Sequence, residues 1–133
     1  MKVLIIDDEV QIQKLLRITL ESADFDVLLA STGKEGLTVA ANQQPDLIIL
    51  DLGLPDENGQ IILKKLREWF TKPVIILSVQ KGEENIVRTL DDGANDYLIK
   101  PFRTGELLAR MRSALRTSLP HENSPLIEYK NFE

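Results

Sequence analysis

The stretch Leu47-Ile48-Ile49-Leu50 decides the fold, because its four apolar residues follow one another without any polar residue between them. Runs of this kind are typical of strands that are covered on both faces, as in a parallel sheet that lies between helices. Similar short runs recur at residues 3–6, 27–30, 74–77 and 97–99. The sequence therefore predicts five strands of one parallel sheet.

The segments between these runs have apolar residues at helical spacing. In the last of them, for example, Leu107, Leu108, Met111 and Leu115 fall on one face of a helix. Strands that alternate with helices predict an α/β fold, here a (βα)5 doubly wound parallel sheet with the flavodoxin-like strand order 2-1-3-4-5. The expected helices cover residues 11–21, 33–42, 59–69, 83–92 and 104–117.

Composition narrows the class of protein. A chain of 133 residues favours one domain, and the absence of cysteine excludes disulfides and thiolate metal sites and permits a reducing cytoplasm. No apolar run approaches the roughly 18 residues that cross a bilayer, so no membrane association is expected. The net charge of −5 argues against general DNA binding by this chain alone.

Polar residues stand where the predicted strands end. Asp7 and Asp8 follow the first strand, Asp51 the third, Ser78 the fourth and Lys100 the fifth. Ligands bind beyond the carboxyl ends of the strands in open α/β sheets, so these side chains are expected to converge on one edge.

Three carboxylates that lie close together repel one another, so at neutral pH either the pKa of one of them is raised or the three hold a cation. Oxygen ligands favour a hard cation, and few protein ligands favour Mg²⁺, to which the Gly53 carbonyl could add a ligand. Asp51, expected within reach of both the metal and Lys100, suits a nucleophile that takes up a phosphoryl group. Singly, each aspartate could be a turn residue, and one member of the Asp7–Asp8 pair could cap the first helix.

Three stretches of the chain resemble the receiver domain of bacterial two-component response regulators, and the resemblance extends over residues 2–117. They are Ile5-Ile6-Asp7-Asp8-Glu9, Pro45-Asp46-Leu47-Ile48-Ile49-Leu50-Asp51-Leu52-Gly53-Leu54-Pro55, and Asp92-Gly93-Ala94-Asn95-Asp96-Tyr97-Leu98-Ile99-Lys100-Pro101-Phe102.

The resemblance implies that a sensor histidine kinase phosphorylates Asp51 and that Mg²⁺ binds Asp7, Asp8, Asp51 and the Gly53 carbonyl. It implies that Lys100 pairs with the phosphoryl group from a cis Lys100-Pro101 peptide. Ser78 then moves toward that group, and Tyr97 turns inward. Phosphoryl uptake and loss would be self-catalysed, so no separate enzyme activity is expected. Taken without the resemblance, Ser78 could be a turn residue and Tyr97 a buried strand aromatic.

The stretch from Lys100 to Phe102, followed by Glu106-Leu107-Leu108-Ala109-Arg110, resembles the subfamily whose receiver precedes a winged-helix DNA-binding domain. That resemblance implies a receiver at residues 1–118, a linker at 119–125 and the opening strand of a truncated DNA-binding domain at 126–133. It also implies a cytoplasmic transcription regulator. Within the subfamily, Asp51 to Asp56 is most similar to regulators of a potassium-transport operon, which implies a role in potassium homeostasis.

The same subfamily implies homodimerisation on activation, through ion pairs on the last two helices and the last strand. The chain offers Asp91 with Arg112 and Asp96 with Arg110, and it departs from the pattern where Ile86 replaces the basic partner of Glu106. By default these charges are surface residues, and Glu106 and Arg110 have the spacing of a local i,i+4 bridge. Two more departures follow Ser78: Val79 stands where a small residue is usual, and Gln80 where arginine is common.

Other functions compete with this interpretation. A Mg²⁺-dependent phosphatase with an aspartyl nucleophile needs a second acid two residues after it, where Gly53 stands. A flavin-binding electron carrier needs a phosphate loop after the first strand, where Asp7-Asp8-Glu9 would repel phosphate. A receiver that acts alone, through protein contacts only, remains the other alternative.

Overall fold

The computed structural model describes residues 1–118, and these form one five-stranded sheet flanked by five helices. All strand pairs are parallel and their order is β2-β1-β3-β4-β5, which confirms the predicted fold. The strands are β1 (Lys2–Ile6), β2 (Asp26–Ala30), β3 (Leu47–Asp51), β4 (Val74–Ser78) and β5 (Asp96–Ile99). The helices are α1 (Val10–Ser22), α2 (Gly33–Gln43), α3 (Gly59–Leu66), α4 (Glu83–Asp91) and α5 (Thr104–Ser118).

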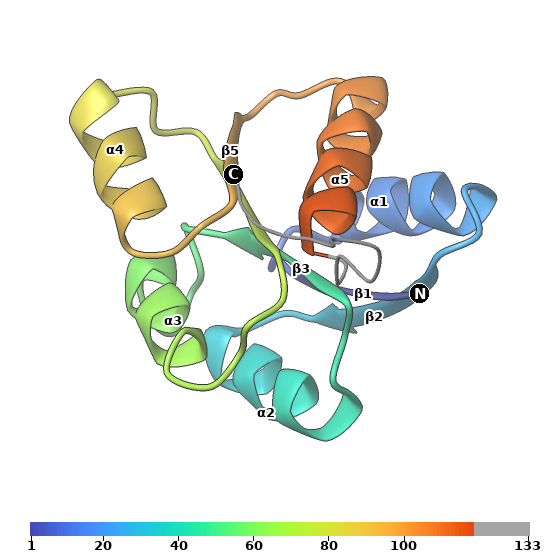
Figure 1. Ribbon diagram of the computed structural model, residues 1–133, viewed down its shortest axis with the longest axis horizontal. Helices are drawn as coiled ribbons and strands as arrows, with labels where there is room; N and C mark the ends of the chain where they lie inside the picture. The colour runs from blue at the N-terminus through green and yellow to red at the C-terminus, as the bar shows by residue number, and fades with distance from the viewer. Residues whose placement is uncertain (119–133) are drawn as a thin grey trace, which may run out of the picture.

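The helices cover both faces of the sheet, with α1 and α5 together on one face and α2, α3 and α4 on the other (Figure 1). Successive residues of a strand point to opposite faces. Accordingly Val3 and Ile5 pack with α1 and α5, whereas Leu4 and Ile6 pack with α2 and α3. Every residue of β3 and β4 is buried, because both strands lie inside the sheet and are covered on both faces. This explains why their sequences show no alternation.

Helix α3 is shorter than predicted, since it ends at Leu66 rather than at residue 69. The Arg67 side chain accounts for this end. It donates hydrogen bonds to the carbonyl oxygens of Phe70, Lys72 and Gly93, which hold the chain in a turn toward β4. Burial lowers the pKa of Arg67. The boundaries of the other elements differ from the predicted ones by at most one residue.

No helix within residues 1–118 is both long enough and apolar enough to span a membrane. The predicted linker at 119–125 and the predicted opening strand at 126–133 lie outside the residues that the structure describes.

Candidate functional site

The carboxyl ends of four strands bring the polar residues together, as the topology demands. Asp7 follows β1, Asp51 ends β3, Ser78 ends β4 and Lys100 follows β5. A cavity of about 290 Å³ opens at this edge, and its lining includes Asp51, Ser78 and Lys100 together with Asp8 and Gly53.

Three of these residues form an acidic cluster. Carboxylate oxygens of Asp7, Asp8 and Asp51 all lie within 4.8 Å of one another. Asp7 is fully buried and Asp51 nearly so, whereas Asp8 is exposed. Burial raises the pKa of Asp7 above its usual value, and the charge of Asp51 adds to this effect. Oxygen donors at this spacing fit a small divalent cation, with the open side of the cluster left for water ligands.

The structure also shows what Asp7 does besides joining the cluster. Its Oδ1 accepts a hydrogen bond from the backbone N–H of Glu9 at 2.9 Å, and its Oδ2 lies 3.1 Å from the Lys100 ammonium. The N-cap position of α1 belongs to Glu9, and no side chain caps that position. Neither member of the Asp7–Asp8 pair therefore occupies the N-cap position that the alternative gave to one of them.

Lys100 joins the acids into one network. Its Nζ lies 2.7 Å from Glu9 Oε1, 3.1 Å from Asp7 Oδ2 and 3.5 Å from Asp51 Oδ1. Burial opposes the charge of this ammonium. The hydrogen bond to Glu9 and the charges of Asp51 and Asp7 outweigh that burial, so the pKa of Lys100 is raised. Lys100 is therefore a cation at neutral pH, directed at the cluster, and its peptide bond to Pro101 is cis.

The loop between β3 and α3 carries Gly53 beside Asp51. Asp51 Oδ1 accepts a hydrogen bond from the Gly53 N–H at 3.1 Å. Farther along the loop, the carboxylate of Asp56 accepts hydrogen bonds from the backbone N–H groups of Gly33 and Lys34, at the start of α2. These two bonds lower the pKa of Asp56.

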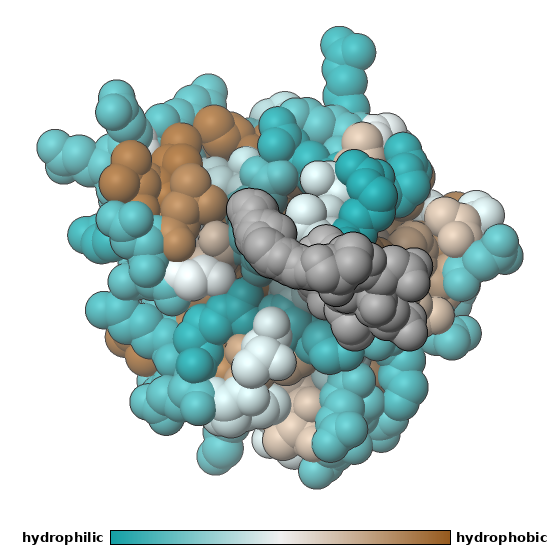
Figure 2. Space-filling view, in the orientation of Figure 1, coloured by the Kyte–Doolittle hydropathy of each residue, from teal (hydrophilic) through white to brown (hydrophobic). Residues whose placement is uncertain are grey.

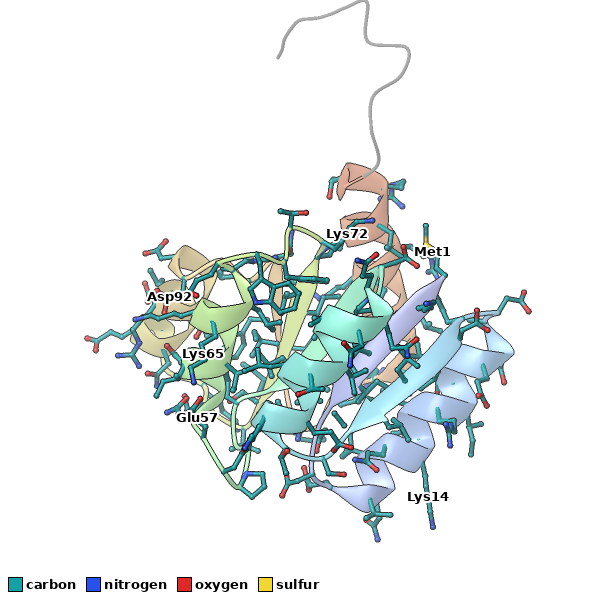
Figure 3. All side chains as sticks on the ribbon, turned by 90° about the horizontal axis from the view of Figure 1, so that it is seen from below. Met1, Lys14, Glu57, Lys65, Lys72 and Asp92 are labelled. Atoms are coloured by element: carbon teal, nitrogen blue, oxygen red, sulfur yellow. The ribbon has the colours of Figure 1, made fainter. Side chains whose placement is uncertain are left out.

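The same loop is tied to α3 as well. Glu57 pairs with Lys65 at 2.9 Å, and Figure 3 shows the two labelled side chains close together. The loop is thus anchored to both neighbouring helices, which restrains the backbone around Gly53.

Ser78 and Tyr97 are both hydrogen-bonded to the backbone of Gln80. Ser78 Oγ accepts a hydrogen bond from the Gln80 N–H, and the Tyr97 hydroxyl donates to the Gln80 carbonyl oxygen, each at 3.0 Å. Tyr97 is only 9% exposed, so its ring lies inward, against the core formed with α3 and α4. The structure thus shows one of the two positions that the switch hypothesis requires for Tyr97.

On the surface formed by α4, β5 and α5, ion pairs join residues of the same chain. Arg110 pairs with Asp96 at 3.0 Å and with Glu106 at 3.2 Å, and these bonds raise the pKa of Arg110. The local Glu106–Arg110 bridge is thereby confirmed. Asp91 and Arg112 are exposed.

Apolar residues of α4 lie on the same surface. Ile86 is half-buried and packs against the core. Its neighbours Val87 and Leu90 are 47% and 39% exposed, and Figure 2 shows hydrophobic atoms gathered over α4. The exposed apolar residues of this helix are therefore Val87 and Leu90 rather than Ile86.

Sequence reasoning did not identify two of these contacts. Glu9 belongs to the quoted acidic stretch, but nothing in the sequence relates it to Lys100, which is 91 residues away. Asp56 looked like an ordinary loop residue, and the Asp-Glu-Asn-Gly composition of its loop indicates only a turn.

Residues 3–112 match the family model described as the response regulator receiver domain. The chain belongs to the response regulator receiver domain family. This membership decides against the phosphatase and the flavin-binding carrier, and the receiver is a phosphorylation-activated switch of two-component signalling rather than a classical enzyme.

The receiver is 48% identical over 132 residues to the transcriptional regulatory protein KdpE of Mycobacterium tuberculosis, covering 98% of the chain and 58% of that relative. It is 47% identical over 130 residues to the KDP operon transcriptional regulatory protein KdpE of Escherichia coli, covering 97% of the chain and 58% of the relative. The chain thus spans 58% of the length of both relatives.

Among solved structures, the BeF3-activated N-terminal receiver domain of RstA from Klebsiella pneumoniae matches with a TM-score of 0.83 and 31% identity, over 87% of this chain and 99% of that one.

Proposed function

We propose that Asp51 is the phosphoacceptor of this switch and that a sensor histidine kinase is its phosphodonor. The observation that carries the proposal is the position of Asp51, which shares an acidic cluster with Asp7 and Asp8 and lies 3.5 Å from the Lys100 ammonium. It lines the cavity at the carboxyl edge of the sheet, so its carboxylate is accessible to a donor despite being 6% exposed.

The reaction is a transfer between two side chains. A carboxylate oxygen of Asp51 attacks the phosphorus of a phosphohistidine, and the P–N bond breaks with its electron pair left on the imidazole nitrogen. The new P–O bond gives an aspartyl phosphate. The Lys100 ammonium offsets the negative charge that the three terminal oxygens of the phosphoryl group bring into the cluster.

Asp7, Asp8, Asp51 and the Gly53 carbonyl would hold Mg²⁺, because the three carboxylates already lie within 4.8 Å of one another. When bound, the cation neutralises charge on the phosphoryl oxygens. This chain contributes the aspartate cluster and the restrained loop that presents Gly53, and its own chemistry is limited to phosphoryl uptake and hydrolysis.

Loading of Asp51 would be transmitted through Ser78 and Tyr97. Both side chains bond to Gln80, so a movement of Ser78 toward the phosphoryl group changes the position of the residue that holds the Tyr97 hydroxyl. A new charge at one end of this connection biases a two-state surface on α4, β5 and α5. A coupling of about 1–3 kcal/mol is sufficient to shift the population.

Activation would then promote a homodimer through that surface. Asp91 and Arg112 are available for ion pairs between copies, and Val87 and Leu90 add exposed apolar area beside Ile86. Arg110, Asp96 and Glu106 would first have to share or exchange the pairs that they make within the chain.

Both relatives are named as the transcriptional regulatory protein KdpE, and the name of the Escherichia coli relative specifies the KDP operon. We propose the same setting here: a cytoplasmic receiver at residues 1–118 that controls transcription, in response to potassium supply, through a winged-helix DNA-binding domain joined by the linker at 119–125.

The test of the acceptor is an intact-mass measurement after incubation with acetyl phosphate and Mg²⁺. Wild type and Asp46→Asn, a change at the opposite end of β3, should each gain one phosphoryl group, whereas Asp51→Asn should gain none. An adduct that persists in Asp51→Asn would show that another residue is the acceptor. Gel filtration with beryllofluoride and Mg²⁺ then shows whether activation produces the dimer.

Val79 lines the same cavity and is 70% exposed. Because its branched side chain narrows access to Asp51, Val79→Ala should speed hydrolysis of the aspartyl phosphate. Unchanged hydrolysis kinetics would contradict this role of Val79.

A further inference from the structure

Among the acidic side chains around Lys100, Glu9 makes the shortest contact with its ammonium, although it is no member of the acidic cluster. Its Oε1 lies 2.7 Å from Lys100 Nζ, closer than the oxygens of Asp7 and Asp51. The cluster that fits a cation contains Asp7, Asp8 and Asp51. Glu9 is thus the acidic neighbour of Lys100 that the cation does not require.

Glu9 lies directly before α1, at a position where another contact would be expected. Glu9 is the N-cap residue of α1, where a side chain ordinarily accepts a hydrogen bond from the first turn. No such capping bond forms at α1. The carboxylate instead extends across the edge of the sheet to the residue that follows β5. Its side chain is 58% exposed, so burial does not force it into this place.

The hydrogen-bonding capacity of the ammonium shows what the contact does. A lysine ammonium has three N–H donors. Two of them serve Glu9 at 2.7 Å and Asp7 at 3.1 Å. Asp51 Oδ1 lies farther away, at 3.5 Å, which leaves one donor for an acceptor on the Asp51 side. A phosphoryl oxygen on Asp51 would take that donor without breaking either existing bond.

We infer that Glu9 is a positioning residue for phosphoryl uptake, which holds the Lys100 ammonium so that its remaining donor faces the group bound at Asp51. Asp7 cannot do this alone, because a cation bound in the cluster would compete for its carboxylate oxygens. Glu9 lies outside the cluster, so its carboxylate would still accept the hydrogen bond from Lys100. This inference rests on the proposed phosphoacceptor role of Asp51.

The experiment compares Glu9→Ala and Glu9→Gln with wild type and with Glu21→Ala. Glu21 is an exposed acid at the other end of α1, paired with Arg17, and its removal changes the net charge equally. Two quantities are measured at saturating Mg²⁺: the affinity for beryllofluoride, a phosphoryl mimic, and the initial rate of adduct formation with acetyl phosphate. The Mg²⁺ concentration for half-maximal rate is measured separately, and urea unfolding checks that each variant is folded.

Glu9→Ala should weaken beryllofluoride binding and slow adduct formation about fivefold, within the range of an exposed ion pair. Glu9→Gln should restore part of both, because its amide oxygen still accepts a hydrogen bond from Lys100. Glu21→Ala should match wild type. Wild-type behaviour of Glu9→Ala would overturn the inference, and so would equal losses in the two Glu9 variants, which would show a charge effect alone.

These outcomes differ from a failure of the proposed function. If Asp51 is not the acceptor, Asp51→Asn still takes up a phosphoryl group, whatever the Glu9 variants do. If Glu9 has no positioning role, Asp51→Asn takes up none, and the Glu9 variants react like wild type.

Discussion

Gly59 supports the acceptor aspartate from behind, and replacing it should damage the site through the backbone. A Cβ at this position would lie 2.5 Å from the Leu52 Cα and 2.6 Å from the Asp51 carbonyl oxygen. Carbon atoms in contact are ordinarily about 3.5–4.0 Å apart, so Gly59→Ala requires a displacement of about 1 Å between α3 and the end of β3. Neither clashing atom belongs to a side chain that could rotate away.

The free energy of this displacement follows from two opposed effects. Overpacking in a close-packed region costs about 1–3 kcal/mol, and alanine in a helix regains about 0.5–1 kcal/mol relative to glycine. The expected net loss in the free energy of unfolding is about 1–2 kcal/mol, which a domain of ordinary stability survives. Because the shift moves the Asp51 backbone, phosphoryl uptake should slow by at least about tenfold.

The assay is urea unfolding followed by circular dichroism, together with the rate of adduct formation from acetyl phosphate. Gly105→Ala is the matched control, because nothing lies within 4 Å of a Cβ at that position of α5. It should leave both quantities at or slightly above wild type. If Gly59→Ala unfolds at the wild-type urea concentration and reacts at the wild-type rate, the reasoning is refuted.

Three further predictions concern the acids and Tyr97. Asp7→Asn should raise the free energy of unfolding in EDTA by about 1 kcal/mol, because burial disfavours the charged carboxylate. The variant should no longer be stabilised by Mg²⁺. A lower free energy of unfolding in EDTA than that of wild type would contradict this prediction. Asp56→Ala should lower the free energy of unfolding at pH 7, and the difference from wild type should shrink below about pH 4. A carboxylate whose pKa is lowered by folding stabilises the fold above its unfolded pKa, and this stabilisation is lost as the pH falls through the folded pKa. A difference in urea unfolding that does not change with pH would count against this prediction. Tyr97→Phe should cost about 0.5–1.5 kcal/mol in urea unfolding, because the Gln80 carbonyl loses its partner, and undiminished stability would argue against that bond.

The sheet was predictable because its signal is local and repeated. Uninterrupted runs such as Leu47 to Leu50 report burial on both faces, and the structure buries all of β3. The end of α3 was not predictable, because it depends on Arg67 reaching Gly93, which is 26 residues away. A pattern of apolar residues does not predict a hydrogen bond between residues so far apart in the sequence.

The convergence of Asp7, Asp51 and Lys100 was predictable for a topological reason, since parallel strands bring their carboxyl ends to one edge. The residues that Lys100 and the loop after β3 contact could not be predicted from the sequence. Glu9 rather than Asp7 makes the shortest contact with Lys100, and Asp56 bonds to the backbone of α2. Both contacts depend on where a loop or a helix start lies in space, which residue types alone do not determine.

Locating the acyl phosphate in the sequence shows which carboxylate of the cluster takes up the phosphoryl group. Borohydride reduces an aspartyl phosphate to homoserine, so wild-type protein is loaded with acetyl phosphate and Mg²⁺, reduced, digested and sequenced by mass spectrometry. We expect homoserine at position 51 and aspartate at positions 7 and 8. Homoserine at position 7 or 8, with aspartate retained at 51, would rule out Asp51 as the acceptor.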